Sequence, residues 1–591
     1  MPQNDSIAIT GEGIVCAIGT DKESVLHSLL HGESGVGAFC HLRSIHHELP
    51  VGEVPLSNDE LKESLGIPTS KPESRTTLLG MAAARQAIRE ACLTEDTASQ
   101  LRIVLISGTT VGGMDITEHY YPTFDSSDEH LPWLMSHSCG SSTEAIASHF
   151  GIFSESTTIS TACSSAANAI LLGAEMLKAG EADIVVAGGS EALSIFHLNG
   201  FNSLMILDKE RCRPFDAQRA GLNLGEGAAY VVMETATGAQ QRGAHSHAYL
   251  TGWGNACDAY HQTASSDDGE GAFLAMQEAL GCACIAPSDI SYVNAHGTGT
   301  PNNDLSESHA LRRIFGTALP PTSSTKAFTG HTTSASGSIE AVICLLAMRH
   351  HFIPANLGWH EQMPDGITPC LGQSGATLRH VLCNSFGFGG NDTALIFSQE
   401  PLPAATHPTP TCGPINVVAE IEITSEDQLQ EIRQYVKPLE ARRMGKLMKS
   451  ALLSSLKALD AAGIDKPDAI ITATSMGCLE NSERLLDALC AEGEAAMKPT
   501  LFMQSTHNTA SSAIAIHTRC HGYNITYSHG MESMEWALRD ARRLLSSGRC
   551  KNVLVGCHDE TTPHYRQLME RLGISGMPSI HSKAILITCG R

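Results

Sequence analysis

Cys163 is the residue whose surroundings favour nucleophilic chemistry most clearly. It lies in the segment 161–165 (TACSS), after a β-branched run at 157–160 and before a run of helix formers at 166–179. A cysteine at such a strand-to-helix turn lies near unpaired N–H groups of the first helical turn, which favour the thiolate. We therefore expect its pKa to fall from ~8.5 toward roughly 3.5–7.5, as in an acyl-accepting nucleophile. Taken alone, a single cysteine is more often an inert core residue.

Four further groups of residues follow Cys163 in a fixed order. They are 213–216 (RPFD) with 225–227 (GEG), 294–300 (NAHGTGT), 326–331 (KAFTGH) and 384–390 (NSFGFGG). Together with the cysteine they resemble the β-ketoacyl-acyl carrier protein synthases, condensing enzymes with a Cys-His-His site on a thiolase-type fold. The resemblance runs from about residue 5 to 399. It implies an acyltransferase, a 3-oxoacyl-[acyl carrier protein] synthase.

The resemblance also implies the catalytic roles. Cys163 would carry the acyl group as a thioester. His296 and His331 would donate hydrogen bonds to the thioester oxygen when a malonyl group loses carbon dioxide and charge develops there. Lys326 and Glu340 match the family's additional lysine and its carboxylate partner, and the alternative for them is a purely structural ion pair.

The substrate-binding residues are implied in the same way. An oxyanion hole would use the backbone N–H groups of Cys163 and Phe388, and glycines around Phe388 permit close backbone approach. Phe388 also occupies the family's gatekeeper position, where its ring would swing to admit an acyl chain. Thr298 and Thr300 match the threonines that bind a phosphopantetheine arm, and Phe386 is expected at the same site.

The sequence departs from the family pattern around the acyl chain. Residues 108–113 (GTTVGG) replace the usual Gly-Ser-Gly-Ile-Gly-Gly loop. The resemblance therefore places Val111 in the wall of the acyl pocket. Residues 219–222 (RAGL) replace the usual Arg-Asp-Gly-Phe. These differences leave the length and saturation of the acyl chain open.

The implied partner is an acyl carrier protein in its acyl- and malonyl-loaded forms. No cofactor is expected on this chain, because the carrier bears the phosphopantetheine arm. The carrier is expected to be acidic, and Lys209, Arg211 and Arg213 are candidate contacts, with ordinary solvated surface as an equal alternative.

Composition argues against several other classes of protein. The net charge of −24 over 591 residues disfavours a nucleic-acid surface. No apolar run approaches the ~20 residues of a membrane span, and residues 1–5 do not resemble a secretory signal. The nineteen cysteines are irregularly spaced and form no paired CxxC motif for zinc. We expect a cytoplasmic protein without a metal site.

Short apolar strands alternate with helices along residues 1–399, which is typical of an α/β architecture. Strands are expected at 7–15, 103–106, 184–191, 248–254 and 394–397, with a strand and turn at 291–300. Helices are expected at 21–31, 75–92, 141–149, 166–179, 271–280 and 338–349. The resemblance implies a thiolase-like αβαβα fold, with a nucleophile half over about 1–245 and a histidine half over about 246–399.

Residues 400–414 contain five prolines and are predicted to be a linker to a second copy. A shift of 368 residues aligns 135–192 with 503–560 without a gap, which places Met531 at the position of Cys163. A thioether cannot become an acyl-accepting thiolate, and neither histidine motif recurs within 415–591. We predict a degenerate half-copy of the fold over 415–591, with convergent α/β patterning as the alternative.

This tail resembles the truncated ketosynthase-like and chain-length-factor subunits of type II polyketide and aryl-polyene pathways. Ketosynthases of this family dimerise through the half that carries the cysteine. We therefore expect 415–591 to dock on 1–399 as a tethered pseudo-partner. A short linker would raise the effective concentration of that contact to roughly the millimolar range. Further oligomerisation stays open.

Other functions fit parts of this pattern. A non-catalytic chain-length factor or scaffold is opposed by the joint presence of Cys163, His296 and His331. A thiolase would use a second cysteine late in the chain. Among decarboxylating ketosynthases, the fused tail favours a polyketide or aryl-polyene pathway over housekeeping fatty-acid synthesis.

Overall fold

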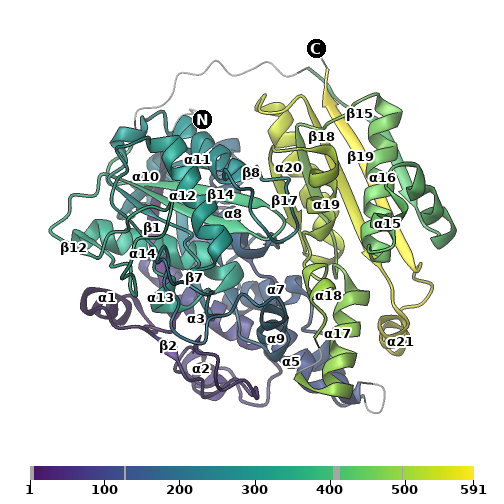
Figure 1. Ribbon diagram of the computed structural model, residues 1–591, viewed down its shortest axis with the longest axis horizontal. Coiled ribbons are helices and arrows are strands. Elements are labelled where there is room, and N and C mark those ends of the chain that lie inside the picture. Colours follow the sequence, from purple (N-terminus) through teal and green to yellow (C-terminus); the bar gives the residue numbers. More distant parts are fainter. Residues whose placement is uncertain (1–5, 125–127, 403–412, 495–496, 591) are drawn as a thin grey trace.

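The nucleophile half is built on a five-stranded mixed sheet. The computed structural model describes residues 6–124, 128–402, 413–494 and 497–590 (Figure 1). The sheet order is β1 (Ile7–Cys16), β7 (Gly227–Thr235), β6 (Ile184–Glu191), β4 (Ile103–Gly108) and β5 (Glu155–Ile159).

The histidine half continues this sheet from its β1 edge. In order outward from β1 come β8 (Ala248–Cys257), β14 (Asn391–Ser398), β13 (His380–Gly387), β9 (Tyr292–Asn294) and β10 (Thr322–Ser323). Only Ile7–Ile9 of β1 pairs with β8, so the two halves of the sheet are joined over three residue pairs. Four two-residue strands form two small separate ribbons: β2 (Val36–Gly37), β3 (Val51–Gly52), β11 (Phe352–Ile353) and β12 (Gln373–Ser374).

Helices cover and separate these two halves. The outer helix α3 (Arg75–Glu90) packs on β1, β7 and β6, and α11 (Glu270–Ala283) packs on β8 and β14. Between the halves lie α8 (Ser165–Ala179) and α14 (Ser336–His350), which also contact each other. The predicted αβαβα layering is therefore confirmed. The remaining helices are α1 (Lys22–His31), α2 (Asn58–Leu65), α4 (Glu95–Gln100), α5 (Met114–Tyr120), α6 (Leu131–Leu134), α7 (Cys139–Phe150), α9 (Ile195–Ser203), α10 (Ala236–Arg242), α12 (Pro301–Phe315) and α13 (Lys326–Thr329).

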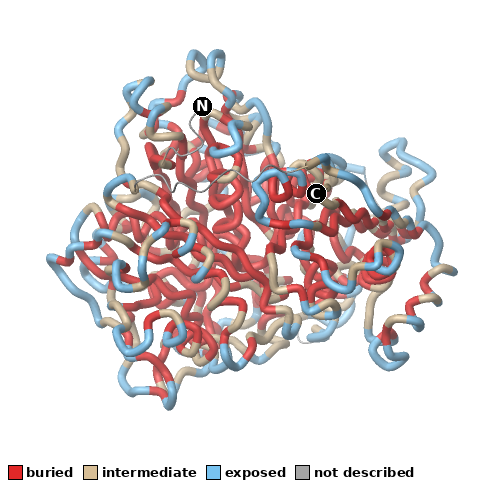
Figure 2. The backbone as a smooth tube through the Cα atoms, turned by 90° about the horizontal axis from the view of Figure 1, so that it is seen from above, coloured by how far each residue is buried: buried red, intermediate tan, exposed pale blue. Residues whose placement is uncertain are grey.

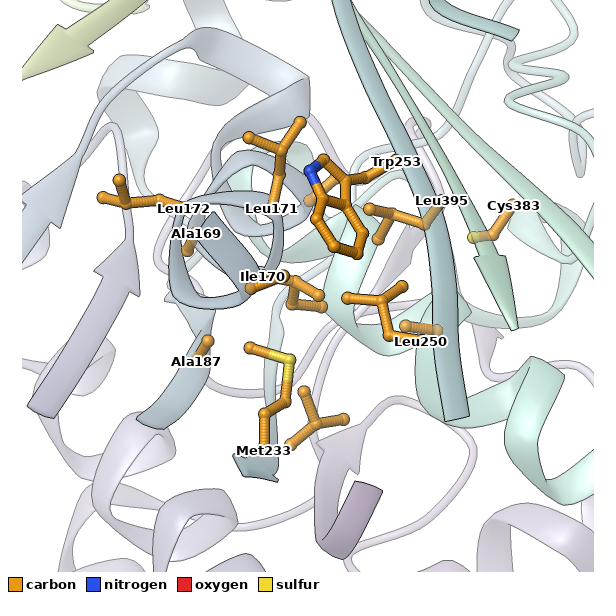
Figure 3. Packing of buried hydrophobic residues seen from close by; sticks show 14 of the residues in the cluster. Ala169, Ile170, Leu171, Leu172, Ala187, Met233, Leu250, Trp253, Cys383 and Leu395 are labelled. Atoms are coloured by element: carbon orange, nitrogen blue, oxygen red, sulfur yellow. The ribbon is translucent and has the colours of Figure 1, made fainter. Parts of the chain in front are cut away.

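Helix α8 positions the nucleophile because it is buried on almost every side. Ile170, Leu171 and Leu172 are fully buried, and Figure 3 shows them between β-sheet residues on either side, among them Met233 and Trp253. Each such side chain contributes roughly 1.5–3 kcal/mol of hydrophobic stabilisation. A helix that is apolar all round is fixed in the core, so the turn at its first residue is fixed too.

The tail repeats the nucleophile half element by element. Outward from the junction, its sheet order is β17 (Asn524–Tyr527), β16 (Ala469–Ala473), β18 (Asn552–Glu560), β19 (Ile580–Cys589) and β15 (Ile415–Ile423). This corresponds strand for strand to β5-β4-β6-β7-β1 of the first copy. The tail helices are α15 (Pro438–Ala441), α16 (Lys446–Ala462), α17 (Leu479–Glu492), α18 (Pro499–Met503), α19 (Thr509–Thr518), α20 (Ser533–Ser546) and α21 (Pro563–Arg571). The ungapped shift of 368 residues places α7 on α19, β5 on β17, α8 on α20 and β6 on β18.

The two copies meet where β5 pairs antiparallel with β17. Ile159 pairs with Tyr527, the Ser160 N–H donates to the Thr526 carbonyl at 2.9 Å, and the Ser528 N–H donates to the Thr158 carbonyl at 3.0 Å. Fifteen strands of the described residues thus form one sheet, and buried backbone continues from the first region into the tail (Figure 2). Within the chain, the tail lies where the expected pseudo-partner would lie.

Oppositely charged side chains reinforce this junction. Arg543 of α20 is 5% exposed, donates to both carboxylate oxygens of Glu181 at 3.0 and 3.1 Å, and also contacts the buried Asp540. Tyr523 and Tyr527 donate to the same Asp540 at 2.9 and 3.0 Å. Glu155 and Glu181 of the first region are therefore complementary in charge to Arg539 and Arg543 of α20.

The predicted linker 400–414 lies partly outside the described residues, which exclude 403–412. None of the helices that the structure describes combines the length and the apolar character needed to cross a membrane.

Replacing Arg543 by methionine should destabilise the docked tail strongly. Removing one partner of a buried ion pair leaves the other charges unpaired and costs about 3–5 kcal/mol. The matched control is Lys446→Met at the start of α16, whose partner Glu426 is 46% exposed. That exposed pair should cost under about 1 kcal/mol. Urea unfolding followed by tryptophan fluorescence measures both, and equal shifts of the midpoint would contradict the prediction.

Candidate active site

The turn that presents Cys163 is strained and tightly held. Ala162 adopts φ +52°, a left-handed conformation that a non-glycine residue rarely takes. The Ser165 hydroxyl accepts from the Thr161 N–H at 2.9 Å and donates to the Ala162 carbonyl at 2.7 Å. The Ser164 hydroxyl donates to Asn391 Oδ1 at 2.8 Å. Such strain persists only where surrounding contacts fix it, and it is common at functional sites.

Cys163 lies beside both predicted histidines. Its Sγ is 3.1 Å from His331 Nε2, and the His331 and His296 rings are 5.3 Å apart at 82° to each other. The His296 ring is also 5.7 Å from that of Phe386. One cavity of about 420 Å³ collects most of the predicted site residues: Cys163, His296, Thr298, Thr300, His331, Phe386 and Phe388.

Glycine and backbone hydrogen bonds set the place of His331. It follows Gly330, which has φ +71°, and a Cβ there would come within 2.6 Å of the Leu224 carbonyl oxygen. The His331 N–H donates to the Asn223 carbonyl at 2.7 Å. The KAFTGH motif therefore needs its glycine for close backbone approach.

Glu307 of α12 sets the place of His296, and the sequence did not reveal it. Its carboxylate accepts from the backbone N–H groups of His296 and Gly297 at 2.9 and 2.8 Å, and from Asn384 Nδ2 at 3.2 Å. Burial raises the pKa of Glu307 to about 7, against the lowering effect of these donors. An acidic residue about two helical turns after a glycine-rich turn was the available signal.

Both histidines are neutral at ordinary pH. Burial lowers the pKa of His331 well below its usual value, and the charge of Lys326 lowers it further. The pKa of His296 is also well below its usual value, because burial, the charge of Lys326 and the neighbouring His331 all lower it. A neutral imidazole has one donor and one acceptor nitrogen, so each ring can donate one hydrogen bond without bringing a positive charge.

The predicted low pKa of Cys163 is wrong. Burial raises the pKa of its thiol to about 12, although the Lys326 charge and the Phe388 N–H both act to lower it. The reason is desolvation, since Cys163 is only 5% exposed and the low-dielectric surroundings disfavour a charged sulfur. The proton stays on sulfur until an acceptor takes it, and the nearest nitrogen is His331 Nε2.

Lys326 and Glu340 form an ion pair behind the histidines and do not line the cavity. The lysine Nζ donates to Glu340 Oε1, and the two side chains are 1% and 2% exposed. The Ser336 hydroxyl lies 3.5 Å from His331 Nδ1 and 3.4 Å from Glu340 Oε1, which links the pair to His331. Burial raises the pKa of Glu340 while Lys326 lowers it.

Val111 lies apart from the other predicted residues. It lines a separate cavity of about 40 Å³ at the junction of the two copies, together with Phe196 and the tail residue Phe502. The rings of Phe388, Phe201 and Phe502 separate that cavity from the Cys163 cavity, with centroids 5.7 and 5.3 Å apart in succession.

The equivalent turn of the tail is intact but carries no nucleophile. Gly530 has φ +56° at the position of Ala162, and Met531 is 97% exposed at the position of Cys163. The turn geometry is thus retained while its chemistry is absent.

Family models match almost all of this architecture. Beta-ketoacyl synthase, N-terminal domain, matches residues 4–239, and Beta-ketoacyl synthase, C-terminal domain, matches 247–360. A second N-terminal-domain model matches residues 418–587, which confirms the predicted half-copy. The cysteine turn and two histidines on a thiolase-like fold define a condensing acyltransferase. The chain belongs to the β-ketoacyl synthase family.

Similar proteins include 3-oxoacyl-[acyl-carrier-protein] synthases and ketosynthase/chain-length-factor proteins. The 3-oxoacyl-[acyl-carrier-protein] synthase 2 of Staphylococcus aureus (strain COL) is 32% identical over 68% of this chain and 99% of its own length. The solved "ishigamide ketosynthase/chain length factor" is 30% identical with TM-score 0.62, covering 67% of this chain and 100% of its own. The "PfaC Keto synthase-Chain length factor" covers 99% of this chain and 78% of its own, with TM-score 0.81 and 16% identity, and so shows the fold alone.

Alkylation of Cys163 by iodoacetamide should accelerate about tenfold per pH unit between pH 7 and 10. The pKa of about 12 keeps the thiolate fraction small and rising throughout that range. Mass spectrometry of the Cys163 peptide measures the rate, with the exposed Cys40 in the same digest as an internal control for the reagent. A plateau reached below pH 8 would show a low-pKa thiolate instead.

Proposed function

We propose that this protein condenses an acyl thioester with malonyl-acyl carrier protein, releasing carbon dioxide and forming a 3-oxoacyl-acyl carrier protein. The observation that carries the proposal is the contact of Cys163 Sγ with His331 Nε2 at 3.1 Å beside His296. A non-catalytic scaffold would not need that juxtaposition.

Acyl transfer is the first step. Cys163 loses its proton toward His331, and its sulfur attacks the carbonyl carbon of the acyl thioester. The backbone N–H groups of Cys163 and Phe388 stabilise the oxyanion. The carrier's thiolate departs and takes the proton back from His331, and the acyl group stays on Cys163 as a thioester. The turn's fixed geometry favours this step because the sulfur is already oriented.

Decarboxylation and condensation follow. The malonyl carboxylate leaves as carbon dioxide, and its bonding electrons pass into a thioester enolate. His296 and His331 donate hydrogen bonds to the enolate oxygen, and their neutral state prevents simple protonation of the oxygen. The enolate carbon then attacks the acyl carbonyl and expels the Cys163 sulfur as a thiolate, which takes up one proton from solvent to restore the thiol.

The remaining predicted residues support these steps. Lys326 would keep both histidines neutral through its charge, with Glu340 as its buried counter-ion. Thr298 and Thr300, whose hydroxyls are 2.9 Å apart at the cavity wall, would hold the phosphopantetheine arm. For the carrier itself, Lys209 and Arg211 are exposed, while Arg213 is already paired with Asp208 and Glu210.

The tail favours a specialised pathway over housekeeping fatty-acid synthesis. The small cavity at Val111 shares His137, Ser138, Met476 and Ser482 with a further cavity of about 170 Å³ at the same junction. A growing chain could therefore pass Phe388 and continue between the two copies. A ketosynthase of Xenorhabdus doucetiae solved with its chain length factor is 29% identical to this chain, and one solved with its type II PKS acyl-carrier protein is 25% identical. These two neighbours support a polyketide-type role over a housekeeping one.

Intact-mass analysis with acyl-loaded carrier protein tests the chemistry. The wild-type chain should gain one acyl group and Cys163→Ala none, because the substitution removes the sulfur that forms the thioester. His331→Ala and His296→Ala should lower carbon dioxide release from malonyl carrier about 10²-fold or more, the usual loss for one oxyanion donor. Equal labelling of wild type and Cys163→Ala would overturn the proposal.

Phe502→Ala should extend the range of acyl chains. Removing this ring opens the path from the Cys163 cavity to the cavity at Val111. Acyl chains just longer than the longest that the wild type accepts should then load about tenfold faster or more. A series of acyl carriers of increasing length measures the limit. Phe153→Ala is the matched control, since its ring packs on Phe150 and lines neither cavity. Identical limits in both variants would show that the chain takes another path.

A further inference from the structure

The loop that carries the second oxyanion donor lies against the tail. Phe388 lines the same cavity as Cys163, and its backbone N–H acts to lower the pKa of the Cys163 thiol. The next peptide, Phe388–Gly389, has both of its polar atoms hydrogen-bonded. Its N–H donates to the Gln262 carbonyl at 2.7 Å, within the first region. Its carbonyl accepts from Asn508 Nδ2 at 2.9 Å, and Asn508 belongs to the tail.

Asn508 makes this contact instead of its ordinary local one. It is the N-cap residue of α19, a place where an asparagine side chain usually accepts from its own helix. Here the side chain makes no cap hydrogen bond, and the residue is only 2% exposed. Its Oδ1 is buried without a hydrogen-bond partner in the described structure. An uncapped helix and an unsatisfied oxygen both cost stability, which indicates that the side chain serves another purpose.

The contact is also specific to the reactive copy. The same shift of 368 residues places Asn508 on Gly140. Gly140 faces the Met531 turn, where a Cβ would lie 3.1 Å from His529 Cα. Asn508 faces the loop of the reactive copy, where a Cβ on Gly389 would lie 2.8 Å from its Nδ2. The amide donor of Asn508 therefore faces the loop of the reactive copy. Its counterpart Gly140, which has no side chain, faces the Met531 turn, which cannot react.

We propose that Asn508 is a positioning residue that holds the Phe388–Gly389 peptide and thereby aims the Phe388 N–H at the reacting centre. The tail, although it has no nucleophile, then completes the active site of the first region. The aromatic contact of Phe502 with Phe201, whose ring stacks on Phe388, supports the same loop from its other side.

The expected effect of Asn508 on acylation rests on the proposed function. Its expected effect on the reactivity of the Cys163 sulfur does not. The Phe388 N–H stabilises the Cys163 thiolate, so a loop released from Asn508 should make the sulfur less reactive toward any electrophile. Iodoacetamide needs no carrier protein and therefore reports on the loop alone.

Two variants of nearly constant volume, Asn508→Leu and Asn508→Asp, remove the amide donor. In single-turnover loading from acyl-carrier protein, both should acylate Cys163 about tenfold or more slowly at saturation, with the half-saturating carrier concentration unchanged within about twofold. Alkylation of Cys163 by iodoacetamide at pH 8 should slow about tenfold, the loss of one hydrogen bond to a charged group. Thr518→Val is the matched control, because it removes a hydrogen bond at the far end of α19.

The outcomes are distinguishable. A folded Asn508→Leu or Asn508→Asp protein with wild-type alkylation and loading rates would overturn the inference, as would an equal loss in Thr518→Val. If the wild type loads no acyl group but the alkylation rates fall as expected, the proposed function fails and the positioning role stands. If Asn508→Leu does not fold, Asn508→Asp gives the same comparison.

Discussion

The pairing of β5 with β17 is the contact on which the rest of the molecule depends. Strand β5 delivers the chain directly into the Cys163 turn, and its outer edge would be an unpaired sheet edge without the tail. The tail closes that edge with the equivalent strand of its own copy, in the antiparallel sense that a two-fold related pair of strands requires. The pseudo-symmetry extends outward from this junction through β4 and β16 to β1 and β15.

Around this junction the two copies have diverged in opposite directions. The first copy keeps a reactive cysteine at a strained turn, and the tail keeps the turn without a reactive group. What the tail retains instead are residues that face its partner: Phe502 in the wall between two cavities, Asn508 at the Phe388 carbonyl, and Arg543 on Glu181. The tail has no reactive group at its own turn, but it supplies side chains that shape and hold the active site of the first copy.

The sequence allowed prediction of the fold, the half-copy and the residues at the site, because local signals carry them. The helical spacing of apolar residues predicted α8, and the glycine-rich motifs predicted the turns that hold His296 and His331. The raised pKa of Cys163 could not be predicted, since it follows from burial by elements distant in sequence. Glu307 and Asn508 were missed for the same reason. Each acts through backbone atoms of another segment. For Glu307 the one signal was an acidic residue after the glycine-rich turn, and for Asn508 no side-chain pattern indicated the contact.

Hydrogen exchange at the amides of Ser160 and Ser528 tests the central claim most directly. These two N–H groups donate across the junction, to Thr526 and Thr158. If the tail docks on its own chain, both amides should be strongly protected, and to the same degree from about ten micromolar down to tens of nanomolar, since an intramolecular contact does not respond to dilution. Protection that is lost on dilution would show pairing between separate chains, and absent protection would show an undocked tail. Either result would contradict the account.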